Sequence, residues 1–483
     1  MNTQVDRSQE VFYELTRSLC PECRRVIDAK VLLRENQVFL KKRCPEHGWF
    51  EARIYGDADL YVAAGRFNKP GTVPVAHTTA IVRGCPLDCG LCPDHGQHIC
   101  VGIVEVNTAC NMACPLCFAD AGAGYNLTLA EVEEILDHFV ATEGHPEVVQ
   151  FSGGEPTIHP DIVAMIRAAK GRDIGQVMIN TNGKRLAEDD AFLAQVAALK
   201  PSLYFQFDGF EPNTYATLRG EPDLLPTKLK ALDRIAEAGL SVILVPAVER
   251  GVNLHEVGRI VEFGLKHPAV RGINFQPAFH AGRHPDHDPL LRLTIPDIVQ
   301  AIAEQTQGTF LASDFIPIPC CFPTCNSASY AFVNDNGVLP LARLINLEDY
   351  LDYIANRVLP DQDAIRGALE QLWSSAAVPG TPSFGEDVLR ACTVCGITGP
   401  QDLGEAGNQL FMLMLQDFMD PWTFTQKNVM KCCKAVLMPD GKQIPFCAYN
   451  NVGYREQARA QLGHRRRGAP TETFIFVDSS GRS

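Results

Sequence analysis

Three cysteines, Cys110, Cys114 and Cys117, lie close together in one short segment of this 483-residue chain. They come shortly after an apolar run, residues 101–106, of the kind that forms a buried strand. Three thiolates hold three irons of a cubane 4Fe–4S cluster and leave the fourth iron without a protein ligand, and an open metal position is where a bound molecule can react. A structural zinc knuckle is the alternative, but it needs a fourth ligand close by and usually draws its cysteines from CxxC pairs.

Strand-like and helical patterns alternate from residue 103 to about residue 306. The clearest helical pattern starts at Thr128, which forms a capping-box pair with Glu131. Six β-then-α periods predict an α/β fold with a parallel sheet and right-handed crossovers. The cysteine segment then lies at the carboxyl rim of the first strand, where barrels carry their chemistry. The six strand-like runs are residues 103–106, 148–151, 177–179, 203–207, 242–245 and 272–275.

Composition limits the partners and the location of the protein. The net charge of −14 argues against a nucleic-acid partner. The first 14 residues contain no apolar signal core, and no apolar run reaches the length of a membrane span. We therefore expect a cytoplasmic protein. In that compartment the 18 cysteines are expected to be metal ligands rather than disulfides.

Two motifs together resemble the radical SAM superfamily. Phe118 follows the last cysteine of the CxxxCxxC segment, and the sequence SGGEPT at residues 152–157 follows the second strand-like run. The resemblance implies a partial (β/α)6 barrel in which Cys110, Cys114 and Cys117 are the catalytic ligands of a 4Fe–4S cluster. It also implies that the open iron chelates S-adenosylmethionine (SAM), and that an electron from the cluster cleaves SAM to a 5′-deoxyadenosyl radical.

A glycine-rich turn and several strand ends are candidates for cofactor contacts. Paired glycines let the backbone approach a ligand closely, and the resemblance implies that Gly153, Gly154 and Glu155 contact the methionine end of SAM. Polar residues at the carboxyl ends of barrel strands point into the barrel mouth. Asn182, after the third strand-like run, is a candidate to hold the ribose or carboxylate of SAM, and a simple Asn–Gly turn is the alternative. The remaining candidates for SAM or substrate contacts are Phe118, Asn180, Gln206, Asp208, Asn274 and Gln276.

Two short knuckles near the N-terminus predict a separate metal site. The first contains Cys20 and Cys23, and the second contains Cys44 and His47. Knuckles about 20 residues apart with strands between them are typical of a zinc ribbon or a rubredoxin-like site. A tetrahedral sulfur-rich site accepts either zinc or iron. Its expected role is structural or electron-relaying.

A second cysteine set repeats the spacing of the first. Cys85, Cys89 and Cys92 have the same x3, x2 spacing, and Cys100 can supply a fourth thiolate. We interpret these residues as ligands of an auxiliary 4Fe–4S cluster with full protein ligation. Identical spacing leaves open that this set is the SAM cluster. The Cys110 set is favoured as the ligands of the SAM cluster, because it follows a strand and precedes the GGEP motif.

Beyond the barrel, the segments at residues 320–325, 432–433 and 447 together offer six thiols, whereas one more cluster needs four. We predict that a third 4Fe–4S cluster uses Cys321, Cys325, Cys433 and Cys447, with Cys320 and Cys432 as the alternative members of their pairs. The CxxC pair Cys392 and Cys395 is interpreted as two buried thiols, with replacement ligands or a redox pair as alternatives.

Four regions are expected from this pattern. They are a metal ribbon at residues 1–75, an auxiliary cluster loop at 76–102, the radical SAM partial barrel at 103–310, and an auxiliary-cluster and substrate-covering region at 311–483. The order of motifs across nearly the whole chain resembles the archaeal tetraether lipid synthases and their relatives, which include proteins proposed as methylases in methanopterin biosynthesis.

The resemblance leaves the substrate open between two classes. The main expectation is an enzyme that joins lipid hydrocarbon chains by C–C bond formation, and it requires an apolar tunnel. The alternative is a radical SAM C-methyltransferase acting on a pterin-like small molecule in a compact polar pocket. The partners would be a lipid or other apolar substrate and a reductant such as ferredoxin or flavodoxin. A non-catalytic iron–sulfur or zinc protein would bind no SAM.

Two segments bear on the lipid hypothesis. Residues 410–415, LFMLML, are a candidate lining of an apolar groove, and plain core is the alternative. The basic run at residues 464–467 is a candidate for peripheral contact with anionic lipid headgroups, and a solvated helix end is the alternative.

Overall fold

The computed structural model describes residues 10–122, 124–334, 337–343 and 410–465. Cys392 and Cys395 therefore lie outside the described residues, as does the end of the basic run at residues 466–467. Among the described helices, none combines the length and the apolar character that crossing a membrane requires.

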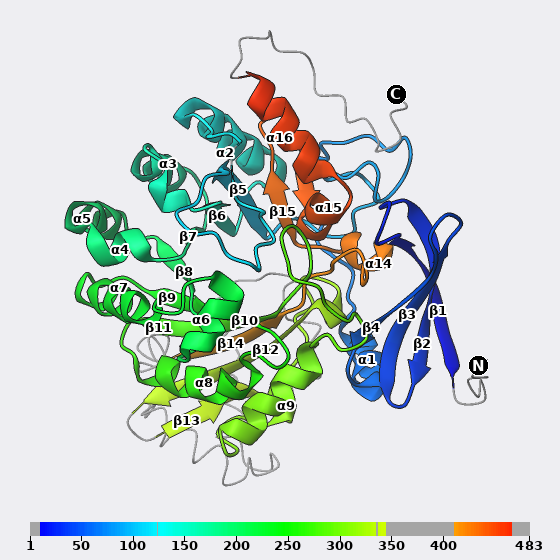
Figure 1. Cartoon of the computed structure of the whole chain (residues 1–483). Coiled ribbons are helices and arrows are strands. Elements are labelled where there is room, and N and C mark those ends of the chain that lie inside the picture. The colour runs from blue at the N-terminus through cyan, green and yellow to red at the C-terminus, as the bar shows by residue number, and fades with distance from the viewer. Residues whose placement is uncertain (1–9, 123, 335–336, 344–409, 466–483) are drawn as a thin grey trace, which may run out of the picture.

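Parallel strands form the predicted α/β half barrel (Figure 1). Each strand pairs in parallel with the next one that follows a helix, as a right-handed series of β-then-α units requires. The predicted fold class, an α/β fold with a partial (β/α)6 barrel, is confirmed. Its six strands are β5 (Val101–Asn107), β6 (Val148–Gly153), β7 (Gln176–Thr181), β8 (Ser202–Gln206), β9 (Val242–Val245) and β11 (Val270–Pro277).

Amphipathic helices cover the outer face of the barrel strands (Figure 1). The capping box of Thr128 and Glu131 is present at the start of α2 (Leu129–Glu143), as predicted. One face of α2 is buried against the sheet, and its largest side chain there is Phe139. The remaining helices of the barrel are α3 (Ile162–Lys170), α4 (Lys184–Glu188), α5 (Asp190–Leu199), α6 (Pro212–Arg219), α7 (Leu225–Glu237), α8 (Val257–Lys266) and α9 (Ile295–Gln305).

Strands from the C-terminal part of the chain extend the sheet at both of its ends. β14 (Leu410–Gln416) pairs in parallel with β11, and β15 (Lys434–Leu437) pairs in parallel with β5. Antiparallel strands then complete a sheet of 12 strands. These further strands are β12 (Asn326–Asn334) and β13 (Gly337–Pro340) beside β14, and β16 (Gln443–Pro445) beside β15; the short β10 (Ala247–Val248) pairs with β11.

Three short C-terminal helices fasten these strands to the barrel. They are α14 (Gln426–Val429), α15 (Phe446–Asn451) and α16 (Tyr454–Arg465). Arg455 of α16 forms a buried ion pair with Glu105 of β5 at 2.7 Å, and the Tyr449 hydroxyl donates to the same carboxylate. The basic run begins in the last two residues of α16.

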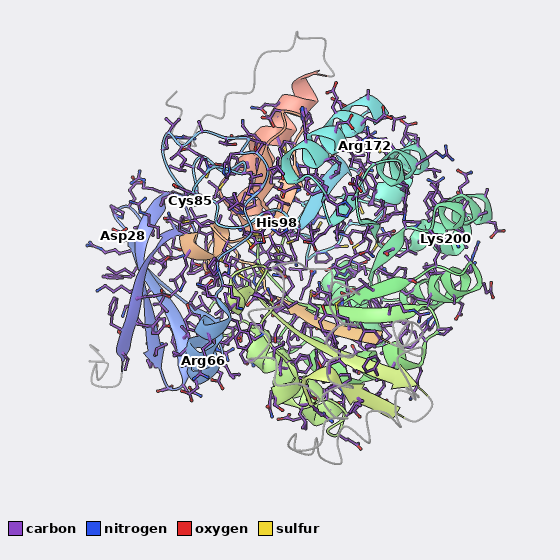
Figure 2. All side chains as sticks on the ribbon, turned by 180° about the vertical axis from the view of Figure 1, so that it is seen from behind. Asp28, Arg66, Cys85, His98, Arg172 and Lys200 are labelled. Atoms are coloured by element: carbon purple, nitrogen blue, oxygen red, sulfur yellow. The ribbon has the colours of Figure 1, made fainter. Side chains whose placement is uncertain are left out.

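The N-terminal region is a separate antiparallel sheet. Its strands follow one another in order, and α1 (Ala58–Ala64) packs beside them. In the view of Figure 2, Cys85 and His98 lie between this sheet, which carries Asp28, and the outer helices near Arg172. The four strands are β1 (Val11–Leu19), β2 (Val26–Arg34), β3 (Gln37–Cys44) and β4 (Gly48–Tyr55).

Two buried cations attach this sheet to the barrel. The Arg53 guanidinium donates to both carboxylate oxygens of Asp297 at 2.9 Å and to the Arg292 carbonyl. The Lys42 ammonium, 1% exposed, donates to the carbonyls of Pro421 and Trp422. Buried cations of this kind need such partners, so the two contacts fix the sheet against the barrel.

Candidate active site

A cavity of about 270 Å³ lies along the barrel strands, from residues at their amino ends, such as Val148 and Gln176, to the cysteine loop and the glycine turn at their carboxyl ends. The carboxyl ends are where parallel barrels carry their functional residues. All but one of the predicted SAM-site residues line the cavity. The lining residues among them are Cys110, Cys114, Cys117, Phe118, Gly153, Gly154, Glu155, Asn180, Asn182, Gln206, Asn274 and Gln276.

The exception is Asp208, which is fully buried beside the cavity. Its two carboxylate oxygens lie 2.6 and 2.7 Å from the guanidinium of Arg219. Arg219 does line the cavity, and it donates to the Leu116 carbonyl within the cysteine loop. Asp208 thus positions an arginine that braces the loop, which corrects the prediction that Asp208 itself faces the ligand.

The cysteine loop is held from the opposite side of the barrel mouth. Cys117 and Arg283 exchange backbone hydrogen bonds of 2.8 and 3.0 Å, and the Arg283 side chain donates to the Cys114 carbonyl. Burial raises the pKa of the Cys110 thiol to about 11 and also raises that of Cys114. Iron coordination removes such protons. Three thiols that line one cavity fit the donor set of a 4Fe–4S cluster with three protein ligands, which these residues would hold.

The glycine turn is packed against the backbone that leads into the cysteine loop. A Cβ atom at Gly153 would overlap the Asn107 carbonyl, and one at Gly154 would overlap the Ala109 carbonyl. Gly153 also has a φ of +138°, which disfavours any residue with a side chain. The GG pair is therefore required for the turn to reach the cavity wall.

Glu155 is committed to neighbouring protein groups. Its side chain is 1% exposed and accepts hydrogen bonds from the backbone of Thr157, the hydroxyls of Thr157 and Thr181, and the Asn182 amide N–H. Asn182 in turn donates to the Asn111 side chain of the cysteine loop at 2.7 Å. Glu155 thus ties the ends of β6 and β7 to the cysteine loop, although the prediction gave it a direct contact with SAM.

The far wall of the cavity contains polar side chains that the sequence reasoning did not select. The Tyr204 hydroxyl accepts hydrogen bonds from the side-chain amides of Asn274 and Gln276, at 2.5 and 2.7 Å. Lys434 also lines the cavity, beside Cys433, and its ammonium donates to Gln416. Tyr204 lies in the middle of a strand and Lys434 comes from the distant C-terminal part of the chain. The alternation within β8, which turns Tyr204 and Gln206 to one face, was the available signal for the tyrosine.

The four predicted ligands of the N-terminal site come together. One ligand atom each of Cys20, Cys23, Cys44 and His47 lies within 4.8 Å of the others. The Cys23 and Cys44 sulfurs are 3.9 Å apart, and His47 Nδ1 is 3.4 Å from the Cys44 sulfur. One ion with bonds of about 2.0–2.3 Å spans such separations, so the donor set fits a single tetrahedral metal ion.

The structure corrects the predicted grouping of Cys100. Its thiol lies with those of Cys320 and Cys433, all within 4.8 Å of one another, and not with the Cys85 set. The physical reason is the pairing of β15 with β5. The Val101 amide donates to the Cys433 carbonyl, so the residues just before the two strands face each other.

The third set is corrected by one residue. The thiols of Cys325 and Cys447 interact electrostatically with that of Cys432. The Cys433 thiol instead lies with those of Cys100 and Cys320. Consecutive residues of an extended chain point to opposite sides, so the Cys432–Cys433 pair serves two sets. Cys321 is close to both, because it interacts with Cys320 and Cys433 and also with Cys325.

The set of Cys85, Cys89 and Cys92 stays together as predicted by its spacing. The Cys89 thiol interacts with Cys85 and Cys92, and burial is among the causes that raise its pKa. A small cavity beside these thiols is also lined by Asp88, Asp94 and His95. Asp88 accepts from the Gly84 amide at 2.7 Å and so closes the turn that carries Cys85.

Known protein families match both the N-terminal sheet and the barrel. The profile of the HMPTM N-terminal zinc ribbon domain matches residues 12–56, and that of the radical SAM superfamily matches residues 104–264. The GTP 3′,8-cyclase of Chlorobaculum tepidum is 32% identical over 36% of this chain and 53% of its own length. The crystal structure of Streptococcus suis SuiB bound to S-adenosylmethionine is similar with a TM-score of 0.37 and 15% identity, over 44% of this chain and 47% of SuiB.

One relative matches nearly end to end. The 7,8-dihydro-6-hydroxymethylpterin dimethyltransferase of Methanocaldococcus jannaschii is 32% identical over 91% of this chain and 94% of its own. This relative is a pterin methyltransferase and not a tetraether lipid synthase, so the finer part of the expected resemblance is not supported. A radical SAM profile over the barrel, a zinc ribbon profile over the N-terminal sheet and a match along almost the whole chain agree with one another. The chain belongs to the radical SAM superfamily, in the family of the 7,8-dihydro-6-hydroxymethylpterin dimethyltransferase.

Proposed function

We propose that this protein is a radical SAM C-methyltransferase that acts on a pterin-like bicyclic small molecule. This activity is the alternative to lipid chain coupling that the order of motifs leaves open. The observation that carries the proposal is the end-to-end similarity to a pterin dimethyltransferase, 32% identical over 91% of the chain. The size and the polar groups of the cavity support the same choice.

The cavity is compact and presents amide groups. Its volume of about 270 Å³ suits one small molecule, since binding pockets for such ligands are generally a few hundred Å³. A primary amide offers both a donor and an acceptor, and so does each edge of a pterin ring. The amide side chains in the wall are Gln150, Gln176, Asn180, Asn182, Gln206, Asn274 and Gln276.

Among these amide side chains, Asn274 distinguishes best between the two classes of substrate. Its Nδ2 donates to the Tyr204 hydroxyl, while its Oδ1 is buried and has no hydrogen-bond partner in the described structure. A buried acceptor without a partner costs about 1–3 kcal/mol, and a ring N–H of a bound heterocycle would remove that cost. A hydrocarbon chain would leave the cost in place, so Asn274 favours a nitrogen heterocycle over a lipid tail.

Aliphatic and aromatic side chains form much of the cavity wall, and Met412 and Met414 of β14 contribute to this apolar part. The alternating residues Leu413 and Leu415 of the same strand lie in the core. A flat ring system needs apolar contacts on its faces and polar contacts at its edges. The wall offers both, because methionine adapts to irregular apolar shapes.

The residues around the SAM site position the reacting groups and limit access of water. When bound by Cys110, Cys114 and Cys117, a 4Fe–4S cluster supplies the electron for reductive cleavage of SAM. The buried Lys228 ammonium donates to the Asn182 carbonyl at 2.5 Å and to Gln206 at 3.0 Å, so it orders two parts of the wall. Radical chemistry depends on such fixed placement and on solvent exclusion more than on a general base.

The test is anaerobic turnover with SAM, a strong reductant and 7,8-dihydro-6-hydroxymethylpterin. SAM would supply both the radical and the methyl group, so we expect 5′-deoxyadenosine and S-adenosylhomocysteine together with a pterin product heavier by one CH2 for each methyl group added, all followed by mass spectrometry. The Asn274→Ala variant should lose about tenfold to a hundredfold in kcat/KM for the pterin while still binding SAM, because a buried hydrogen bond is removed. Gln300→Ala, on the exposed side of α9, is the matched control.

Two other results would contradict the proposal. The first is the formation of joined hydrocarbon chains in a parallel reaction with host lipid extract, without any pterin methylation. That result would support lipid chain coupling instead. Cleavage of SAM by the Cys114→Ala variant would show that the SAM cluster is held elsewhere. A low-potential electron carrier such as ferredoxin or flavodoxin is the proposed physiological reductant.

A further inference from the structure

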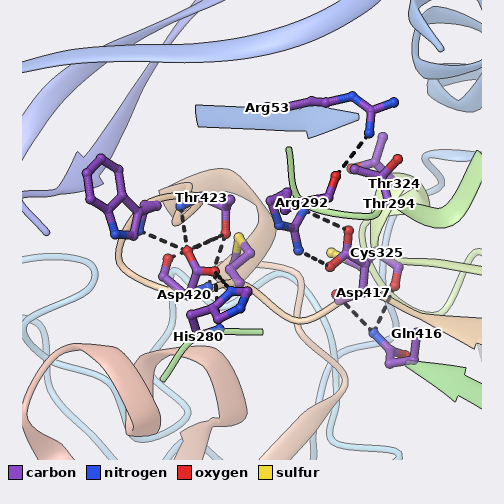
Figure 3. Close-up of polar contacts among 12 residues, drawn as sticks. Arg53, His280, Arg292, Thr294, Thr324, Cys325, Gln416, Asp417, Asp420 and Thr423 are labelled. Carbon is purple, nitrogen blue, oxygen red and sulfur yellow. Dashed lines mark hydrogen bonds and ion pairs between the residues drawn. The ribbon is translucent and has the colours of Figure 1, made fainter. Parts of the chain in front are cut away.

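A cluster of two histidines and one aspartate lies outside the catalytic cavity and outside all of the cysteine sets. His280 and His287 are on the loop that follows β11, and Asp420 is on the turn that follows β14. One ring nitrogen of each histidine and one carboxylate oxygen lie within 4.8 Å of one another. His280 is 3% exposed and Asp420 is fully buried. Figure 3 shows Asp420 beside His280 within its polar surroundings.

Two ring nitrogens in this cluster are buried without a hydrogen-bond partner. They are Nδ1 of His280 and Nε2 of His287. His280 Nδ1 lies 3.8 Å from Oδ2 of Asp420, which is too far for a hydrogen bond. An ion about 2.0–2.2 Å from each atom bridges that separation. A buried polar atom without a partner is costly, and one bound cation would satisfy both of these nitrogens.

The surroundings fix the orientation of two of the three side chains. Glu249 Oε2 lies 3.2 Å from His280 Nε2, which places a ring proton on Nε2 and leaves the Nδ1 lone pair toward Asp420. A carboxylate behind a ligating histidine is the usual support of a protein metal site. The other oxygen of Asp420 accepts from the backbone of Trp422 and Thr423, at 2.9 and 3.0 Å. Oδ2 is thereby held on the His280 side.

His287, the third residue of the cluster, would have to change its ring orientation to bind an ion. The rings of His280 and His287 stack face to face, with centroids 3.5 Å apart and an angle of 5° between their planes. An imidazole lone pair lies in the plane of its ring, so His287 reaches the ion by turning out of the stack. His287 is only partly buried, and its loop neighbour His284 is exposed. This edge of the cluster is therefore the one nearest to solvent.

We propose that His280, His287 and Asp420 bind one divalent transition-metal ion of the zinc or iron(II) class. Two imidazoles and one carboxylate form the donor set that such ions accept in proteins. The ion would tie the loop after β11 to the turn after β14. Phe279, next to His280 in the sequence, and Phe418, two residues before Asp420, line the catalytic cavity with ring centroids 5.4 Å apart. The metal would thus brace one wall of the cavity.

The experiment compares His287→Ala with His284→Ala in the full chain. The two residues have the same side chain and share one loop, and His284 also contacts the His280 ring, but only His287 belongs to the cluster. Each protein is purified anaerobically with its iron–sulfur clusters, freed of loosely bound metal, and titrated with Co²⁺ alone. We expect wild type and His284→Ala to bind one more Co²⁺ per chain than His287→Ala, with weak bands that lack sulfur-to-metal charge transfer.

The N-terminal cysteine site serves as an internal control of folding. Its thiolate–cobalt bands and the iron–sulfur absorbance should be the same in all three proteins. Equal Co²⁺ binding by wild type and His287→Ala would overturn the proposal, as would equal losses in both variants. Glu249→Gln gives a second measurement. It should weaken Co²⁺ binding at this site about tenfold to a hundredfold, and an unchanged affinity in a variant that retains the other bands would also contradict the proposed site.

Discussion

At the scale of single residues, Glu155 illustrates how a motif residue can act through its neighbours. Its carboxylate accepts from Thr157, Thr181 and Asn182 and is almost fully buried. The motif therefore shapes the SAM site by holding the ends of two strands against the cysteine loop. A residue with this role influences binding only as far as it keeps Asn182 in place.

Replacement of Glu155 by glutamine tests this role. A glutamine amide cannot accept hydrogen bonds at its nitrogen, so at least one of the donors that face Glu155 would lose its partner. Hydrogen bonds to a charged group contribute about 1.5–3 kcal/mol, and we expect the free energy of unfolding to fall by that order. SAM affinity should fall with it. Thermal unfolding and equilibrium SAM binding are the measurements, with Glu134→Gln on the exposed face of α2 as control.

A normal melting temperature combined with lost SAM binding would contradict the positioning role. That result would mean that the carboxylate itself contacts SAM, as the motif alone suggested.

The cysteines show what residue spacing can and cannot predict. Cys20, Cys23, Cys44 and His47 were predicted correctly as one group, because each knuckle is a local turn and a single pair of strands brings the two turns together. Cys100 and Cys433 were placed in different groups by their spacing. Their neighbourhood depends on β15 lying beside β5, a pairing between segments more than 300 residues apart. No local pattern contains that information.

At the scale of elements, β5 shows how closely the first barrel strand is packed. Gly102 lies between the α2 residue Phe139 and the β15 residue Leu437. An added Cβ atom there would come within 2.7 Å of both side chains. The strand therefore joins the C-terminal extension to the barrel through a contact that only glycine permits.

We expect Gly102→Ala to destabilise the protein by about 1–3 kcal/mol, because overpacking a filled core forces neighbouring side chains from their preferred positions. The melting temperature of the purified chain is the measurement. Gly463→Ala is the matched control, since a Cβ at this position of α16 meets nothing within 4 Å and alanine favours a helix. Equal melting temperatures for Gly102→Ala and wild type would show that Phe139 and Leu437 can yield.

The alternating half barrel was predictable because its strands and helices repeat along the chain and pair with their neighbours. The six apolar runs all lie in the six barrel strands, or adjoin them by a residue. The two outer parallel strands were not recognised. For β14 the sequence offered a ligand-lining segment or plain core, and the structure uses both, since alternate residues face the cavity and the core. A single strand with two buried faces has no amphipathic signal to reveal this division.

At the scale of the whole molecule, the N-terminal sheet is held by contacts that lie next to the functional parts. Arg53 binds both oxygens of Asp297, which also caps α9 through Thr294. Arg53 is 6% exposed, and its partner carboxylate is mostly buried. Because the pair lies between the ribbon sheet and the barrel, it links the folding of one to the placement of the other.

Arg53→Met should therefore loosen the sheet from the barrel without unfolding its metal site. Removing one partner of a buried ion pair leaves the other charge uncompensated and costs about 3–5 kcal/mol. We expect faster hydrogen exchange in β4 and α9 and a lower melting temperature, while the four N-terminal ligands still hold their metal. Arg34→Met is the control, because its pairs with Glu10 and Glu51 are partly exposed and such pairs contribute only about 0–1 kcal/mol. If Arg53→Met and Arg34→Met gave the same exchange pattern, the sheet would be held by Lys42 and apolar contacts, and the Arg53 pair would have no share in docking it.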